Sequence, residues 1–179
     1  MIGTASGSKA DYVRSLGVQP VDYRTEDFVS RVRELTGGSG VDVVFDAISV
    51  ENFARSYEAL KPDGRLVTYG LYRASLTGAP GSSRALLGEF LRWQWQRLLW
   101  DWFPDQHKTV SFYSITEMRE DHPDWFREDL SQLFELAAQG RIRPNIWKTL
   151  PLANAAEAHR MIEGGEVRGK IVLRVADRE

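Results

Sequence analysis

Short apolar runs alternate with amphipathic segments along the 179 residues. The apolar runs predict strands over residues 2–5, 20–23, 41–46, 65–69, 110–113, 146–150 and 170–175. Apolar residues at helical spacing predict helices over residues 8–16, 25–36, 53–60, 86–103, 124–138 and 153–163, with Thr25 as N-cap of the second. Pro62-Asp63-Gly64 predicts a turn, and residues 71–84 predict a loop. This alternation is typical of βαβ units on a parallel sheet, so the sequence predicts an α/β fold.

Composition and charge narrow the classes of function. The hydrophobic fraction of 42% and the charged fraction of 27% are ordinary for a soluble globular protein. A net charge of -2 produces no field that would attract nucleic acid or anionic lipid. No segment approaches the roughly 20 apolar residues of a membrane span, and the first residues do not resemble a secretory signal. We therefore expect a cytoplasmic protein with no integral membrane segment and no nucleic-acid partner.

The residues that commonly bind metals are few and scattered. Cysteine is absent, which excludes disulfides and thiolate metal sites. His107, His122 and His159 fall in three different predicted elements without the spacing of metal ligands. The sequence therefore predicts no metal site.

The predicted helix over residues 86–103 is apolar on two sides. Its longer stripe consists of Leu87, Leu91, Trp95, Leu98 and Trp102, and we expect this face to turn toward the domain core. Trp93 and Trp100 lie nearly opposite, which predicts a contact outside the core. That contact could be another domain, a second subunit or a membrane interface, and packing within the protein is favoured over membrane.

Four segments, in order, carry a resemblance to a known family. They read IGTASGSKADYVRSLG, VDYRTEDFVSRVRELTGGSGVDVVFDAI, LKPDGRLVTYG and GRIRPNIWKTLPLANAAEAHRMIEGGEVRGKIVLRV. Together they resemble the quinone oxidoreductase branch of the zinc-independent medium-chain dehydrogenases/reductases. The aromatic middle is similar to the subgroup of the vesicle amine transport protein. The resemblance implies a doubly wound, Rossmann-like parallel sheet.

The resemblance also implies a domain organisation. Residues 1–179 match a partial NADP(H)-binding Rossmann domain from its second strand to its end, without the family's GroES-like catalytic half. No G-x-G-x-x-G occurs, so we expect the sheet to be incomplete at its first βα unit and Met1 to be a late start. In the strand order 3-2-1-4-5-6 the first strand is central, which predicts a gap between two groups of strands. Such a chain is expected to be marginally stable and to expose unpaired strand edges.

Candidate cofactor residues follow the first two predicted strands. Ser6 and Lys9 come where an NAD-preferring site carries an acidic residue, and no acid precedes Asp11. A hydroxyl and an ammonium group suit a 2′-phosphate, so these residues favour NADP(H). Tyr23 matches a position where the family places an aromatic residue against the adenosine phosphate. The alternatives are a solvated polar loop and a tyrosine that packs on the next helix.

The turns after two later strands are also candidates. Ala47 and Ile48 follow one strand, and Gly70 and Leu71 follow the next. Ligands of open α/β sheets bind beyond the carboxyl ends of the strands, so both turns are expected to line the cofactor. The alternative for Gly70 is a simple turn.

Three further residues are predicted to lie near the nicotinamide. Asn52 matches a family position that contacts this half of the cofactor, although it could equally cap the following helix. Phe112 and Tyr113 match the family's strand near the nicotinamide, although they could equally be buried strand residues. The resemblance identifies no catalytic acid or base here.

The resemblance implies hydride transfer from NADPH to a small-molecule acceptor, a quinone or an α,β-unsaturated carbonyl. The complete enzyme is expected to be a homodimer, and residues 1–179 alone are expected to be inactive. The alternative is a non-enzymatic module that uses the tryptophan-rich helix to bind a partner or a membrane.

Overall fold

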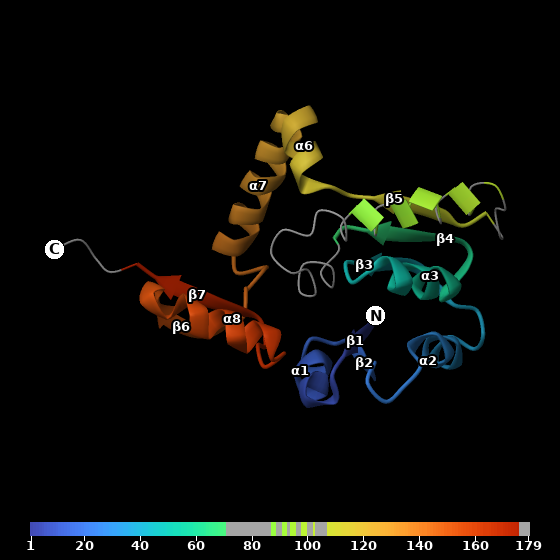
Figure 1. The fold of residues 1–179 in the computed structure, drawn as a ribbon, viewed down its shortest axis with the longest axis horizontal. Coiled ribbons are helices and arrows are strands. Elements are labelled where there is room, and N and C mark those ends of the chain that lie inside the picture. Colours follow the sequence, from blue (N-terminus) through green and yellow to red (C-terminus); the bar gives the residue numbers. More distant parts are fainter. Residues whose placement is uncertain are drawn as a thin grey trace. The chain divides into compact units, whose positions relative to one another are not determined.

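The computed structural model describes residues 1–70 and 107–175, together with residues 87, 88, 91, 92, 94, 95, 98, 99 and 102. The chain divides into two compact units, Met1–Ile115 and Thr116–Glu179. Figure 1 shows the helices and strands of both units, coloured from blue to red in chain order. All described strand pairs are parallel, as the sequence predicts for βαβ units.

The first unit begins with a two-stranded sheet. Strand β1 (Ile2–Ala5) pairs with β2 (Gln19–Asp22), and Ala5 is the register partner of Asp22. The connection consists of a 3-10 turn (Gly7–Lys9) and helix α1 (Ala10–Ser15). The predicted strand over residues 20–23 is therefore shifted by one residue, and the predicted helix over residues 8–16 begins as a 3-10 turn.

A second sheet in the same unit has three strands in the order β3-β4-β5. Its strands are β3 (Val41–Asp46), β4 (Leu60–Thr68) and β5 (Thr109–Phe112). The predicted turn at Pro62-Asp63-Gly64 lies inside β4 as an irregularity, where the register partner changes from Val41↔Leu60 to Val43↔Arg65. Asp63 has a φ of 61°, a left-handed conformation that aspartate tolerates. The strand therefore begins at Leu60, earlier than predicted.

Two helices of this unit have ends that differ from the prediction. Helix α2 (Phe28–Leu35) is capped by Asp27, whose carboxylate accepts from the Ser30 amide at 2.9 Å, and not by Thr25. The Thr25 amide instead donates to the Asp22 carbonyl in a turn after β2. Helix α3 (Val50–Glu58) begins three residues before the predicted start, because Ser49 caps it.

The core of the first unit consists of two clusters that meet. One contains Phe53, Tyr57, Leu60 and Leu66, so α3 covers one face of the three-stranded sheet. The other contains Val21, Phe28, Val32 and Ala59, which packs α2 on β2. Val41 contacts both clusters. Because both clusters include contacts to Val41, side chains join the two sheets. Fully burying a side chain such as Phe53 or Leu66 contributes about 1.5–3 kcal/mol.

No described strand bridges the two sheets of this unit by backbone hydrogen bonds. β1 and β3 each have one strand neighbour among the strands that the structure describes. This separation of β1-β2 from β3-β4-β5 agrees with the gap that the strand order 3-2-1-4-5-6 predicts.

The second unit contains two helices followed by a β-α-β unit. Helix α6 (Ile115–Asp121), which the sequence did not predict, leads from the first unit into helix α7 (Pro123–Ala138). The β-α-β unit consists of β6 (Ile146–Pro151), a 3-10 turn (Leu152–Asn154), α8 (Ala155–Glu163) and β7 (Lys170–Arg174). Leu150 and Ala158 are its buried apolar residues in the described part of the chain.

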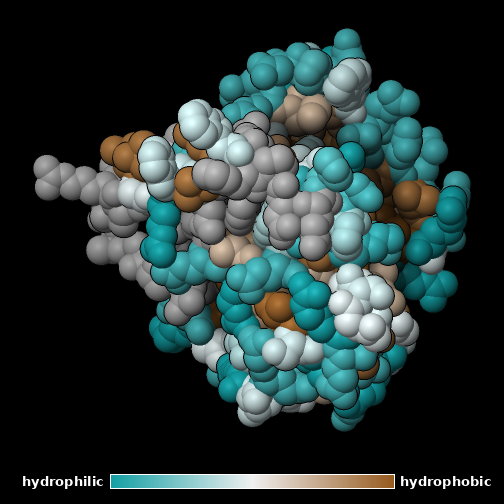
Figure 2. Space-filling view, turned by 90° about the vertical axis from the view of Figure 1, so that its right-hand side faces the viewer, coloured by the Kyte–Doolittle hydropathy of each residue, from teal (hydrophilic) through white to brown (hydrophobic). Residues whose placement is uncertain are grey.

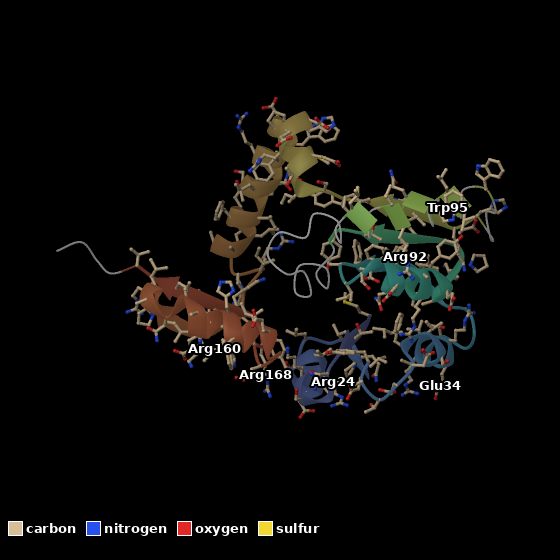
Figure 3. All side chains as sticks on the ribbon, viewed as in Figure 1. Arg24, Glu34, Arg92, Trp95, Arg160 and Arg168 are labelled. Carbon is tan, nitrogen blue, oxygen red and sulfur yellow. The ribbon has the colours of Figure 1, made fainter. Side chains whose placement is uncertain are left out.

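The tryptophan-rich helix, predicted over residues 86–103, differs from the prediction in the orientation of its apolar stripe. Its described residues are helical, but the stripe expected to face inward is between 51% and 79% exposed, at Leu87, Leu91, Trp95, Leu98 and Trp102. Arg92, labelled in Figure 3, donates to Glu51 of α3 at 3.3 Å. The inward orientation of the stripe is therefore wrong. Trp93 and Trp100 lie outside the described residues.

Two phenylalanines test where the core lies. Phe53 is fully buried, whereas Phe45 on β3 is 70% exposed. We expect Phe53→Ala to cost about 3–5 kcal/mol of unfolding free energy, because it removes a buried ring and leaves a cavity. The matched control Phe45→Ala should change it by no more than about 0.5 kcal/mol. Urea unfolding followed by circular dichroism checks both, and equal losses would place the core elsewhere.

The Asp27 cap gives α2 a pH dependence. The Ser30 amide, then the Ser30 hydroxyl and Arg55, hold the pKa of Asp27 below its ordinary value. A lowered folded pKa means that the carboxylate stabilises the fold above the unfolded pKa of about 3.9 and loses this effect as the pH falls through the folded value. Asp27→Ala should therefore lower the unfolding midpoint at about pH 6, and the difference should shrink below about pH 3.9.

Asp27→Asn is the control for this prediction. Asparagine caps helices about as well as aspartate but does not ionise, so its midpoint should not show this pH dependence. A gap between the unmodified chain and Asp27→Ala that stays constant from neutral to acid pH would contradict the assignment.

Candidate functional site

A polar loop follows β1 at its carboxyl end. Ser6 is buried, and its hydroxyl lies 3.2 Å from that of Ser8. The Lys9 amide donates to the Ser6 carbonyl at 2.8 Å and closes the 3-10 turn. The Lys9 residue is half-buried. The loop thus presents hydroxyls and one cation.

The end of β2 lies beside this loop. Because Ala5 and Asp22 are register partners, the next residues, Ser6 and Tyr23, begin adjacent turns. The Tyr23 amide donates to the Ala5 carbonyl at 3.3 Å, and the Tyr23 side chain is 55% exposed. The structure thus brings the predicted residues Ser6, Lys9 and Tyr23 together at one sheet edge.

The turn after β3 is organised by a buried carboxylate. Asp46, the last residue of β3, accepts from the Ile48 amide at 2.8 Å, from Asn52 Nδ2 at 2.6 Å and from Ser56 Oγ at 2.6 Å. A buried carboxylate is costly unless it is fully hydrogen-bonded, and these three donors meet that need. Ala47 and Ile48 are therefore held in a fixed turn at the carboxyl end of the sheet.

The geometry bears on the two interpretations of Asn52. Its side-chain amide donates to Asp46, and its backbone amide donates to Ser49 Oγ at 3.3 Å. The cap of α3 is therefore Ser49, while Asn52 ties the helix to Asp46. The sequence prediction did not single out Asp46. The available signal was an acid that ends an apolar strand, followed by Ser49 and Asn52.

The ends of β4 and β5 contribute a further group. The Tyr69 amide donates to the Asp46 carbonyl at 3.1 Å, which extends the sheet by one hydrogen bond. A Cβ added to Gly70 would lie 3.4 Å from the Ala47 Cβ, so the backbone there passes close to the turn after β3. The predicted residue Leu71 lies outside the described residues.

An apolar hollow lies on the face of this sheet opposite α3. Its volume is about 310 Å³, and its lining consists of Phe45, Val67, Tyr69 and Tyr113. The predicted residue Tyr113 lines this hollow, and its amide donates to the Thr68 carbonyl at 2.8 Å. Phe112 is in register with Thr68 and is not among the lining residues. The hollow can therefore receive a flat or apolar group beside the Ala47-Ile48 turn.

The second unit has a separate hollow of about 670 Å³ at the ends of β6 and β7. Its lining is mainly apolar, with Arg174 as the one charged residue. None of the predicted site residues lies there.

Possible metal ligands were compared across the described residues. No group of three or more His, Asp or Glu side chains gathers in that part of the chain. His122 stacks on Trp125 with 4.1 Å between ring centroids, and His159 lies on α8. A zinc site requires such a cluster of ligands.

The described residues contain no helix with the length and hydropathy needed to span a membrane. On the face shown in Figure 2, hydrophilic residues predominate, and the apolar patches are small and separate.

Known proteins resemble the chain over nearly its whole length. It is 32% identical to the 2-haloacrylate reductase of a Burkholderia species, over 97% of the chain and 47% of that protein. It is 29% identical to the rat synaptic vesicle membrane protein VAT-1 homolog, over 97% of the chain and 42% of that protein. It is 28% identical to quinone oxidoreductase 1 of Escherichia coli, over 97% of the chain and 48% of that protein.

A solved structure agrees with these similarities. The crystal structure of 2-haloacrylate reductase superposes with a TM-score of 0.64 at 30% identity, over 96% of this chain and 48% of that one. The chain thus spans less than half the length of the relatives it matches.

The family of zinc-binding dehydrogenases matches residues 16–173. This span includes β2 to β5 and most of the second unit, and the Rossmann-like fold and the relatives agree with it. The chain therefore belongs to the zinc-binding dehydrogenase family, among the medium-chain dehydrogenases/reductases that its sequence resembles.

Proposed function

We propose that this chain is the nucleotide-binding part of an NADPH-dependent oxidoreductase that reduces a quinone or an α,β-unsaturated carbonyl. The observation that carries the proposal is the meeting of Ser6, Lys9 and Tyr23 at the carboxyl ends of β1 and β2. Ligands of open α/β sheets bind at this edge, and a hydroxyl with an ammonium group can donate to a 2′-phosphate. The relatives that are named as reductases support the reaction class.

We propose that two groups of residues hold the nicotinamide cofactor. Ser6, Lys9 and Tyr23 would hold the adenosine end through charge and aromatic contact. The second group would hold the nicotinamide half at the carboxyl ends of β3, β4 and β5, and it consists of Ala47, Ile48, Asn52, Gly70, Leu71, Phe112 and Tyr113. Of these, Tyr113 lines the apolar hollow, and Leu71 lies outside the described residues. When bound, NADPH supplies a hydride to the electron-poor acceptor. In this proposal the chain positions the cofactor, and the aromatic residues that line the hollow exclude water.

An apolar, aromatic hollow suits the acceptor that we propose. Quinones and conjugated carbonyls are flat and electron-poor, and Phe45, Tyr69 and Tyr113 offer ring surfaces next to the Ala47-Ile48 turn. The complete enzyme, in our proposal, is a cytoplasmic homodimer whose remaining substrate contacts come from a GroES-like half.

Lys9 provides the test of the cofactor. In the complete protein, Lys9→Ala should weaken NADPH binding by about 1–3 kcal/mol, the range for a hydrogen bond to a charged group, and should leave NADH binding nearly unchanged. Calorimetric titration of both cofactors measures this. Lys61→Ala is the matched control, because Lys61 pairs with Asp42 on the other sheet. Equal losses for the two cofactors in Lys9→Ala would contradict the proposal.

The exposed stripe of the tryptophan-rich helix favours a second candidate, a module that binds membranes. Leu91, Trp95 and Trp102 are each more than half exposed, and tryptophan is favoured at the membrane interface. The similarity to a protein named for synaptic vesicle membranes supports this candidate.

Vesicle binding distinguishes the two candidates. If the module hypothesis holds, the protein should sediment with vesicles of phosphatidylcholine and phosphatidylserine, and Trp95→Ala/Trp102→Ala should weaken binding by about tenfold or more. Lys9→Ala should leave vesicle binding unchanged. A protein that binds NADPH and ignores vesicles would exclude the module.

A further inference from the structure

Asp22 brings a negative charge to the loop proposed to hold the 2′-phosphate. It ends β2 and is in register with Ala5, the residue that precedes the loop. A Cβ added to Gly7 would stand 2.5 Å from Asp22 Oδ2, which is closer than real Cβ atoms approach a heavy atom. The carboxylate therefore lies against the backbone of the loop, and the absence of a side chain at Gly7 makes room for it.

The position of this carboxylate is fixed by its surroundings. Asp22 Oδ1 accepts from the Arg24 amide at 3.0 Å, and the Asp22 amide donates to Glu26 Oε1 at 2.9 Å. The Asp22 carbonyl accepts from the amides of Thr25 at 3.1 Å and Glu26 at 2.8 Å. With both its backbone and Oδ1 held, Asp22 directs Oδ2 toward Gly7.

The charges near the loop are mixed. Lys9 lies within it, and the Arg24 guanidinium, labelled in Figure 3, lies 6.0 Å from the centre of the Tyr23 ring. Glu26 is paired with Arg31 at 3.4 Å, which partly neutralises it. No ion pair to Asp22 occurs in the described part of the chain. Asp22 is therefore a carboxylate without an ion pair among the described residues, and it lies against Gly7 of the Ser6–Lys9 loop.

A carboxylate at this place affects the two cofactors differently. It repels a 2′-phosphate, which carries negative charge, but it can accept a hydrogen bond from a ribose hydroxyl. Lys9 acts in the opposite direction, since an ammonium group attracts the phosphate. The preference between the cofactors then depends on the balance of Lys9 and Asp22.

We propose that Asp22 is a specificity-determining residue: its carboxylate, held against Gly7, weakens binding of the 2′-phosphate, so that the site accepts NADH as well as NADPH. The inference rests on the proposed cofactor site, because it assumes that the adenosine ribose lies at the Ser6–Lys9 loop. It goes beyond the proposed function because it predicts that the site discriminates only incompletely between NADPH and NADH.

Asp22→Asn tests this in the complete protein. The substitution keeps the shape and the Oδ1 acceptor for the Arg24 amide but removes the charge. We expect the Kd for NADPH to fall about tenfold, as expected for one removed like charge a few ångströms away. The Kd for NADH should not fall, because the ribose hydroxyl of NADH loses an acceptor and no repulsion is relieved. The probes are NADPH and NADH, titrated by calorimetry. Asp63→Asn makes the same change of charge on the other sheet, at a left-handed position that asparagine tolerates, and should alter neither Kd.

Each outcome decides the question. A raised NADPH-to-NADH preference in Asp22→Asn supports the proposal. An unchanged or lowered preference overturns it, and so does an equal change in both cofactors. If Lys9→Ala selectively weakens NADPH binding while Asp22→Asn has no effect, the result supports the proposed cofactor site and contradicts the proposed role of Asp22. If both variants are without effect, the cofactor site itself is misplaced. Should Asp22→Asn fail to fold, Asp22→Ser tests the same prediction, because the serine hydroxyl can also accept from the Arg24 amide.

Discussion

The buried carboxylate of Asp46 is the interaction on which the centre of the first unit depends. It ends β3, and its three donors come from the turn that follows and from α3. A carboxylate deprived of such donors in a buried place costs several kcal/mol, so strand, turn and helix must adopt one mutual arrangement. All three donors lie within ten residues of Asp46, so this arrangement can form locally, before any distant strand joins the sheet.

The same arrangement determines which side chains of the three-stranded sheet line the apolar hollow of the proposed site. Asp46, Thr68 and Leu66 face α3, so their neighbours Phe45, Val67 and Tyr69 face the other way and line the hollow. The polar loop, in contrast, belongs to β1 and β2, where a short strand is followed by hydroxyls and a lysine. The cofactor that we propose has one charged end and one flat apolar end, and it would extend from the polar loop to the hollow.

The sequence predicted what depends on local periodicity. The strand over residues 41–46 and the helix over residues 124–138 are found almost as expected, since an uninterrupted apolar run or a long amphipathic repeat leaves little choice. Thr25 and Asp27 are both good caps, and the choice between them depends on a turn in which the Asp22 carbonyl takes the Thr25 amide. Leu60 fits the helical pattern but belongs to β4, because pairing with Val41 outweighs propensity.

The nearness of Asp22 to Gly7 could not be predicted, because it follows from the register of β1 on β2. The exposure of the stripe on the tryptophan-rich helix could not be predicted either, because periodicity identifies an apolar face without identifying what that face packs against.

The parallel pairing of the described strands has a consequence for the order in which the fold assembles. Ala5 and its partner Asp22 are separated by 17 positions, whereas Thr68 and its partner Phe112 are separated by 44. Closing the longer loop costs about 0.8 kcal/mol more chain entropy, from the logarithmic dependence on loop length. A parallel sheet cannot lower this cost with a tight hairpin, so its rate of formation is governed by sequence separation. The β1-β2 pair, which carries the polar loop, is then expected to form early, and the addition of β5 to be the slow kinetic step of the first unit.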